Sequence, residues 1–405
     1  MKLIRVGWYL ISALLAANTA QAALFTPTND ADVVQALPYR PSPAARVQQA
    51  RIQGGTLSLP QALTAARSAI DRSRRFGDPR ELGLAQAALA PWWTLAEPPP
   101  EARLLRATLR QSGHDFKAAL ADLAVLTQPS PAVPLAVQAQ ALLTQATVLQ
   151  VTGQLSDARE RCGQLTSHRF APLGAGVSNT GRICLAELRS LRGQPREADA
   201  DLAALTHLSD PAWLSLVRAE AAERRGDGRA AAAHYQASLE ADASVYARAA
   251  YADWLLQAQR PRDVLALLQT QRPGDAQARA ADDTAEADAL ALRRVIALHQ
   301  LRDPRAAAAA RALQARFAEA HLRGDGTHAR EESRFLLDVM GQPGAALVLA
   351  QTNWQAQKEP ADALLLARCA LAAGQPAALA PLREFVRATG WSDARLTALD
   401  RSLQP

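Results

Sequence analysis

The segment LLTQATVLQVTGQLSDARERCGQL, residues 142–165, contains the pattern that decides the fold of this chain. Its first half places apolar or small residues at helical spacing, at Leu142, Leu143, Ala146 and Leu149. Gly153 follows, and glycine closes a helix easily because it adopts the left-handed backbone conformation without a Cβ penalty. Ser156 and Asp157 then suit the start of a second helix. The segment therefore predicts two antiparallel helices joined by a tight turn.

The pairing of a turn glycine with a small apolar residue five positions later returns along the chain. The pairs are Gly77 with Leu82, Gly113 with Ala118, Gly153 with Ala158, Gly193 with Ala198, Gly226 with Ala231, Gly341 with Ala346 and Gly374 with Leu379. Arginine replaces glycine in two further pairs, Arg260 with Leu265 and Arg302 with Ala307. Successive anchors lie 33 to 42 residues apart, which is the period of helical-hairpin repeats. We predict an all-α stack of about nine hairpins.

A second small residue recurs seven positions before the turn glycine. It is found at Ala146, Ala186, Ala219 and Ala367, whereas Arg106, Asp253, Val295 and Arg334 depart from the pattern. With both small positions, the units resemble tetratricopeptide repeats over residues 59–390. The resemblance implies a right-handed superhelical solenoid whose concave side forms an open trough for a protein or peptide partner.

The two ends of the chain differ from the repeats. Lys2 and Arg5 precede an apolar run over residues 6–17 that ends in Ala20-Gln21-Ala22, which predicts a signal peptide over residues 1–22. A retained membrane anchor is the alternative, but the run is shorter than the ~20 residues that span a bilayer. Residues 23–58 are expected to form an N-terminal arm and capping helix, and residues 391–405 a C-terminal capping helix. We expect a periplasmic or secreted protein of a Gram-negative bacterium.

Export makes the pairing of the cysteines a question that the sequence leaves open. Cys162 and Cys184 lie at similar height on neighbouring predicted helices, so either they form a disulfide or they are two small core residues that never meet. Cys369 lies among leucines and is expected to be a buried thiol.

By analogy with the repeat family, the first helix of each hairpin lines the concave side, through positions 13, 10, 6, 3 and 2 before the turn anchor. In the fifth to eighth units this rule selects aromatic, acidic and imidazole side chains as candidate partner-binding residues. They are Trp213, Glu220, Glu223, Trp254, Gln257, His299, His328, Glu331, Phe335 and Asp338. Trp213 and Trp254 have an alternative role, because each of them can simply pack between units.

Other classes of function receive less support. His328, Glu331 and Asp338 allow a metal- or small-ligand-binding enzyme to be drawn, although helix capping explains the same residues. We find no nucleophile elbow, phosphate loop or zinc motif, and we expect no cofactor and no enzyme activity. The net charge of +6 is spread along the helices, which gives nucleic-acid binding little support. A protein-binding scaffold is the favoured function, and a structural spacer without a pocket is the third alternative.

Overall fold

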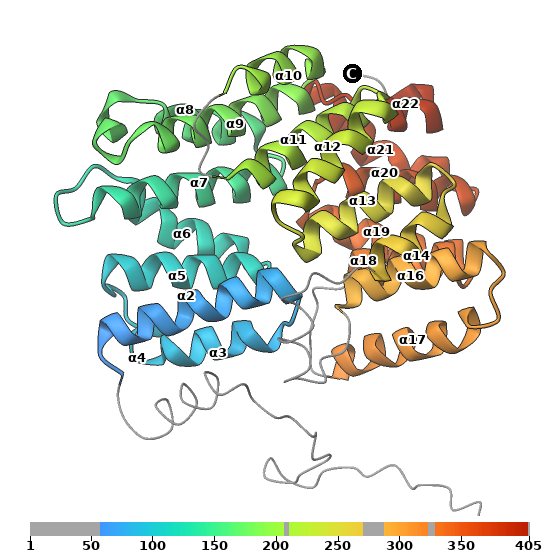
Figure 1. Ribbon diagram of the computed structural model, residues 1–405, viewed down its shortest axis with the longest axis horizontal. Coiled ribbons are helices and arrows are strands. Elements are labelled where there is room, and N and C mark those ends of the chain that lie inside the picture. Colours follow the sequence, from blue (N-terminus) through green and yellow to red (C-terminus); the bar gives the residue numbers. More distant parts are fainter. Residues whose placement is uncertain (1–56, 206–209, 270–286, 323–328, 404–405) are drawn as a thin grey trace, which may run out of the picture.

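The computed structural model describes residues 57–205, 210–269, 287–322 and 329–403, and every regular element within these ranges is a helix. Figure 1 shows the helices stacked as antiparallel hairpins in sequence order. The expected all-α helical-repeat solenoid is therefore confirmed. The signal peptide, the N-terminal arm up to residue 56, and His328 lie outside the described residues.

Nine hairpins follow one another in the described part of the chain. Hairpins one to three are α2 (Leu59–Phe76) with α3 (Arg80–Ala88) and the short α4 (Ala90–Trp93), α5 (Pro100–Ser112) with α6 (Phe116–Thr127), and α7 (Leu135–Val151) with α8 (Leu155–Leu165). After η1 (His168–Leu173), hairpins four to six are α9 (Ala175–Leu191) with α10 (Pro195–Ala203), α11 (Pro211–Arg224) with α12 (Gly228–Ala241), and α13 (Val245–Gln257) with α14 (Pro261–Gln269).

Hairpins seven and eight are α16 (Asp288–Gln300) with α17 (Ala306–Leu322), and α18 (Ala329–Asp338) with α19 (Pro343–Ala356). Hairpin nine pairs α20 (Pro360–Ala372) with η3 (Pro376–Leu379) and α21 (Ala380–Thr389). The chain ends in α22 (Ala394–Leu399) and η4 (Arg401–Leu403), where the sequence predicts one capping helix.

The turns use the left-handed conformation that the glycine pattern predicts. Six of the seven anchor glycines have a positive φ, for example +84° at Gly153. The register is wrong by one residue in two turns, because His114 and Gln259 adopt the left-handed conformation in place of Gly113 and Arg260. The eighth turn is one residue longer than most, since its closing bond runs from the Gln342 amide back to the carbonyl of Leu336.

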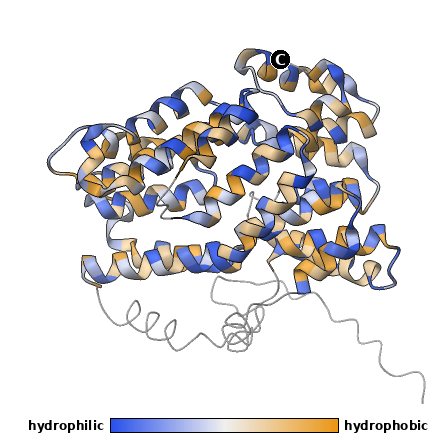
Figure 2. Ribbon diagram, turned by 45° about the horizontal axis from the view of Figure 1, so that its top comes forward, coloured by the Kyte–Doolittle hydropathy of each residue, from blue (hydrophilic) through white to orange (hydrophobic). Residues whose placement is uncertain are grey.

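Small side chains fill the contact between the two helices in seven of the nine hairpins, whereas Ile70 and Val295 take that position in hairpins one and seven. Ala146, Ala186, Ala219 and Ala367 are at most 1% exposed. The corrected turns place Ala107 and Ala252 at the same position in hairpins two and six, and the longer turn places Ser333 there in hairpin eight; all three are buried. Arg106, Asp253 and Arg334 are therefore neighbours of the small position and not departures from it. Figure 2 shows the resulting mixture of apolar and polar residues along every helix.

The solenoid curves so strongly that its two halves meet. In Figure 1 hairpins one to four form the left side and hairpins six to nine the right side. The amide of Lys358 donates to the carbonyl of Val151 over 2.7 Å. Likewise, the amide of Ser392 donates to the carbonyl of Leu191 over 3.0 Å. At the other end of the contact, a Cβ on Gly77 would lie 2.6 Å from that of Ala287. The expected open trough is therefore closed into a ring by the chain itself.

An aromatic cluster fills the contact on the C-terminal side. Trp354 stacks on Trp391 with ring centroids 6.2 Å apart, and Phe385 meets both rings edge-on. These rings belong to the same hydrophobic core as Leu149 and Leu188 of hairpins three and four. Burial of large aromatic surfaces makes the closing contact part of the core and not a loose encounter between ends.

Candidate binding cavity

A cavity of about 760 Å³, open to solvent, lies inside the ring. Its wall consists mainly of the first helices of hairpins three to nine, with further contributions from α2, α12 and α22. Tyr246 and Leu399 line it and are nevertheless 56% and 40% exposed, so large side chains reach into its open space. The volume falls in the range of small-molecule sites, and it holds a short segment of polypeptide more readily than a long helix.

Half of the candidate partner-binding residues line this cavity. They are Glu220, Glu223, Gln257, Glu331 and Asp338. They come from α11, α13 and α18, the first helices of hairpins five, six and eight. Their role in holding a partner stays a prediction.

The other described candidates lie elsewhere. Trp213 packs against the apolar core between hairpins four and five, and Trp254 stacks on Tyr251 at 5.8 Å. Phe335 is buried edge-on against Phe317 at 5.7 Å, whereas His299 is exposed outside the cavity wall. The two tryptophans therefore pack between helices, which is the alternative role that the sequence left open for them.

The displaced turn registers explain several of these misplacements. Asp253 lies six positions before Gln259, and Tyr246 lies thirteen before it, so the family rule selects both when it is counted from the residue that turns the chain. Counted from Arg260, the rule selects Trp254 instead. The same one-residue shift in the longer eighth turn replaces Phe335 by Arg334, which also lines the cavity.

One wall of the cavity is a ladder of ion pairs that links four hairpins. Arg293 of hairpin seven bonds Asp253 of hairpin six, with an N–O distance of 2.6 Å. Arg334 of hairpin eight bonds Asp253 and Asp338, and Arg368 of hairpin nine bonds Asp338. Although burial opposes it, the charges of Arg293 and Arg334 lower the pKa of Asp253. Both carboxylates of this wall thus have arginine partners within the protein.

The wall formed by α9 and α11 is different, because two of its carboxylates accept hydrogen bonds only from neutral donors among the described residues. Glu187 accepts a bond of 2.6 Å from the Gln150 amide, and Glu220 accepts one of 3.1 Å from the Tyr246 hydroxyl. Burial raises the pKa of Glu187, and burial raises the pKa of Glu220 to about 7. Next to them, Glu223 has a counter-charge in Arg395 of α22, 3.0 Å away.

The alternative metal site gains no support from the described side chains. Asp338 is already paired with Arg334 and Arg368. Within the described residues, no group of three or more His, Cys, Asp and Glu side chains is arranged to hold a metal ion. His328 lies outside those residues.

The cysteines on hairpins three and four are joined. Cys162 of α8 and Cys184 of α9 form a disulfide with a Cα–Cα distance of 5.7 Å. Cys369 is buried and unbridged, and its thiol lies 3.6 Å from the Ser333 hydroxyl. The disulfide ties the end of one hairpin to the start of the next.

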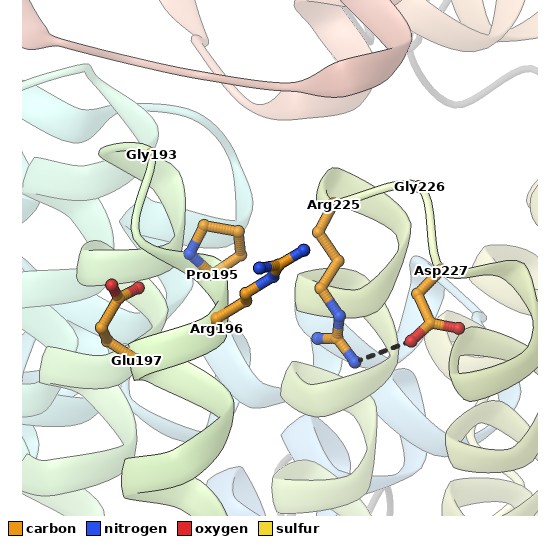
Figure 3. Close-up of a pocket in the computed structure, with 7 residues that line it drawn as sticks. All are labelled: Gly193, Pro195, Arg196, Glu197, Arg225, Gly226 and Asp227. Carbon is orange, nitrogen blue, oxygen red and sulfur yellow. Dashed lines mark hydrogen bonds and ion pairs between the residues drawn. The ribbon is translucent and has the colours of Figure 1, made fainter.

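A second, smaller hollow of about 440 Å³ lies outside the ring, between the turns of hairpins four and five. Figure 3 shows Arg196 extending toward Arg225, whose guanidinium bonds Asp227 at 3.3 Å. Arg196 is exposed and the hollow lies at the outer rim. The larger central cavity is therefore the better candidate for a binding site.

Comparisons with known proteins add little. No protein-family model matches the chain, and no curated protein matches it in sequence. Among solved structures, the chain is similar to the APC/C hetero-tetramer Cut9-Hcn1, with 12% identity, 88% of this chain and 69% of that chain covered, and a TM-score of 0.40. It is also similar to the P58(IPK) TPR domain, with 14% identity, coverage of 81% and 92%, and a TM-score of 0.19.

These similarities are too distant to carry an argument, so the architecture rests on the hairpins themselves. In the part of the chain that the structure describes, no helix combines the length and apolar character needed to cross a membrane.

Proposed function

We propose that this solenoid of tetratricopeptide-like hairpins is a non-catalytic scaffold that holds a short segment of a partner protein inside its central cavity. We further propose that the protein is exported to the periplasm, since its first residues have the composition of a signal peptide.

The cavity wall is the observation that supports binding. Tyr246 projects into the open space, and an exposed aromatic side chain on a rigid helix buries much area at little entropic cost when a ligand covers it. Acidic and basic groups surround it and would fix the register of a bound segment. A spacer protein has no need of such a lining.

A pull-down from periplasmic extract, with the purified protein as bait, tests this function. We expect the wild type to capture one defined protein, which then binds in purified form, and Tyr246→Ala to lose most of that binding. Glu160→Gln is the control, because this carboxylate is 60% exposed on α8. Equal capture by wild type and Tyr246→Ala would contradict a role for the cavity.

Export is tested separately by cell fractionation and amino-terminal sequencing. The periplasmic form is expected to begin at Ala23. A cytoplasmic protein that retains residues 1–22 would contradict export and leave the binding proposal standing.

A further inference from the structure

The carboxylates of Glu187 and Glu220 stand on adjacent first helices and face the same cavity. Within the described residues neither has an ion-pair partner, whereas the other acidic residues of hairpins five, six and nine that line the cavity are each bonded to an arginine. The two groups are close enough for the charge of Glu187 to act on Glu220. This corner of the wall therefore holds two carboxylates without an ion-pair partner among the described residues.

Arg224 supplies a second, independent observation at the same corner. It lies one helical turn after Glu220, lines the cavity and is only 4% exposed. Its Nε donates to the Ser190 hydroxyl over 2.9 Å, but its Nη2 has no hydrogen-bond partner among the described residues. A buried donor without an acceptor costs free energy. An acceptor oxygen supplied by a ligand would remove this cost.

Taken by themselves, Glu187, Glu220 and Arg224 are one positive charge short of neutrality. With both carboxylates ionised, Glu187 and Glu220 carry two negative charges and Arg224 one positive charge. A single cationic group restores neutrality, and a carbonyl oxygen beside it would satisfy Arg224. A lysine side chain has no oxygen near its ammonium group, whereas the amino terminus of a peptide carries its ammonium and its first carbonyl on the same residue.

We propose that the cavity captures the amino terminus of its partner, with the ammonium group at Glu187 and Glu220 and the first carbonyl oxygen at Arg224. This inference rests on the proposed scaffold function and specifies which part of the partner enters. A free α-amino acid presents the same chemistry, so the test must separate the two sources.

Isothermal titration calorimetry of the purified protein with simple probes makes that distinction. The probes are Ala-Ala-Ala amide, its N-acetylated form, free alanine, and N-acetyl-lysine amide. We expect measurable binding of Ala-Ala-Ala amide alone, and a loss of affinity of roughly tenfold or more in Glu187→Gln and Glu220→Gln. Both substitutions preserve side-chain size, and Glu160→Gln serves as the control.

The pH dependence provides a further readout. Besides Glu187 and Arg224, the groups facing Glu220 are Glu223 on its own helix and Tyr246 on α13. Because burial raises the pKa of Glu220 to about 7, while a peptide amino terminus loses its proton near pH 8, affinity should be greatest between these values. Glu220→Gln should remove the acidic side of that profile.

Several outcomes would overturn the inference. Equal binding of the acetylated peptide would exclude recognition of the ammonium group, and preferential binding of N-acetyl-lysine amide would point to a side chain. Binding of free alanine without the tripeptide would indicate a small-molecule site. Failure of every probe, together with a partner captured through Tyr246, would reject amino-terminal recognition and retain the scaffold.

Discussion

Asp253 is the residue at which three hairpins meet. Its carboxylate accepts bonds from Arg293 and Arg334, which come from the two following hairpins. The side chain is only 19% exposed, so its negative charge depends on these partners. Removal of one member of a buried ion pair is far more damaging than loss of a surface pair, since the remaining charges stay desolvated.

Asp253→Asn is therefore expected to lower the free energy of unfolding by about 3 kcal/mol. The matched control is Asp263→Asn, because Asp263 pairs with Arg260 where both side chains are 48% exposed, and such pairs contribute at most about 1 kcal/mol. Urea unfolding at neutral pH measures both. Equal effects of the two substitutions would show that the ladder is not an important source of stability.

Glu220 predicts a dependence of stability on pH. Its pKa is raised from 4.5 to about 7, so between these values the folded protein holds a proton that the unfolded chain has released. Stability from this group therefore falls as the pH rises through that window. Glu220→Gln should gain about 1 to 3 kcal/mol over the wild type between pH 5 and pH 8. Chemical denaturation at both pH values measures the gain, which Glu160→Gln should lack.

At the scale of residues, the sequence predicted acidic and polar side chains in the cavity wall, but it did not identify every residue that lines the cavity. Glu220, Glu223, Gln257, Glu331 and Asp338 followed from the family rule. Tyr246 and Asp253 were missed because the rule was counted from Arg260, and no signal in the sequence marks Gln259 as the left-handed residue. Glutamine pays a steric penalty there that tertiary packing must offset.

Among the elements, the turns serve two purposes, and the structure separates them. Gly77 has φ +67° and lies against Ala287, while Gly341 has φ +62° and nothing within 4 Å of a Cβ built on it. Both need the left-handed conformation. Only Gly77 also allows two distant hairpins to approach.

Gly77→Ala and Gly341→Ala thus form a matched pair. We expect Gly341→Ala to cost about 1 kcal/mol from backbone strain alone. Gly77→Ala should cost at least about 1 kcal/mol more, because Ala287 can retreat only with its backbone. Thermal unfolding of both variants provides the comparison. Equal losses of stability would mean that hairpins one and seven can move apart at Gly77 without a measurable loss of free energy.

The disulfide links two elements that the hairpin pattern leaves unconnected. It closes a loop with a sequence separation of 22 residues between α8 and α9. On the chain-entropy argument its reduction should lower stability by about 3 kcal/mol. Denaturation with and without reductant measures this loss. The double variant Cys162→Ala, Cys184→Ala should be unaffected by reductant, and a wild type that is equally indifferent would contradict the bridge.

For the whole molecule, the hairpins were predictable and the closure was not. Each hairpin follows from local signals, namely a turn residue, a helix start and an apolar stripe. Closure depends on small rotations between successive hairpins that accumulate over the stack. It also depends on Val151 and Leu191 offering carbonyl groups to residues some 200 positions later, and no periodicity records such a pairing.

Ser392→Pro tests the closure directly. Proline removes the amide that donates to Leu191, whereas Ser392→Ala keeps it. We expect the proline variant to lose about 1 to 3 kcal/mol and to show faster hydrogen exchange in hairpins three and four. The alanine variant should resemble the wild type. Indistinguishable exchange in the two variants would mean that the bond contributes nothing to closure.

The closing bonds also restrict how this protein can evolve. An open stack tolerates the gain or loss of a repeat, because each unit touches only its neighbours. Here one additional hairpin between the fourth and the ninth would carry the amides of Lys358 and Ser392 away from their acceptors. Duplication and deletion of repeats, the usual source of length variation in such arrays, would therefore abolish the cavity, so relatives that share it should keep the same number of units.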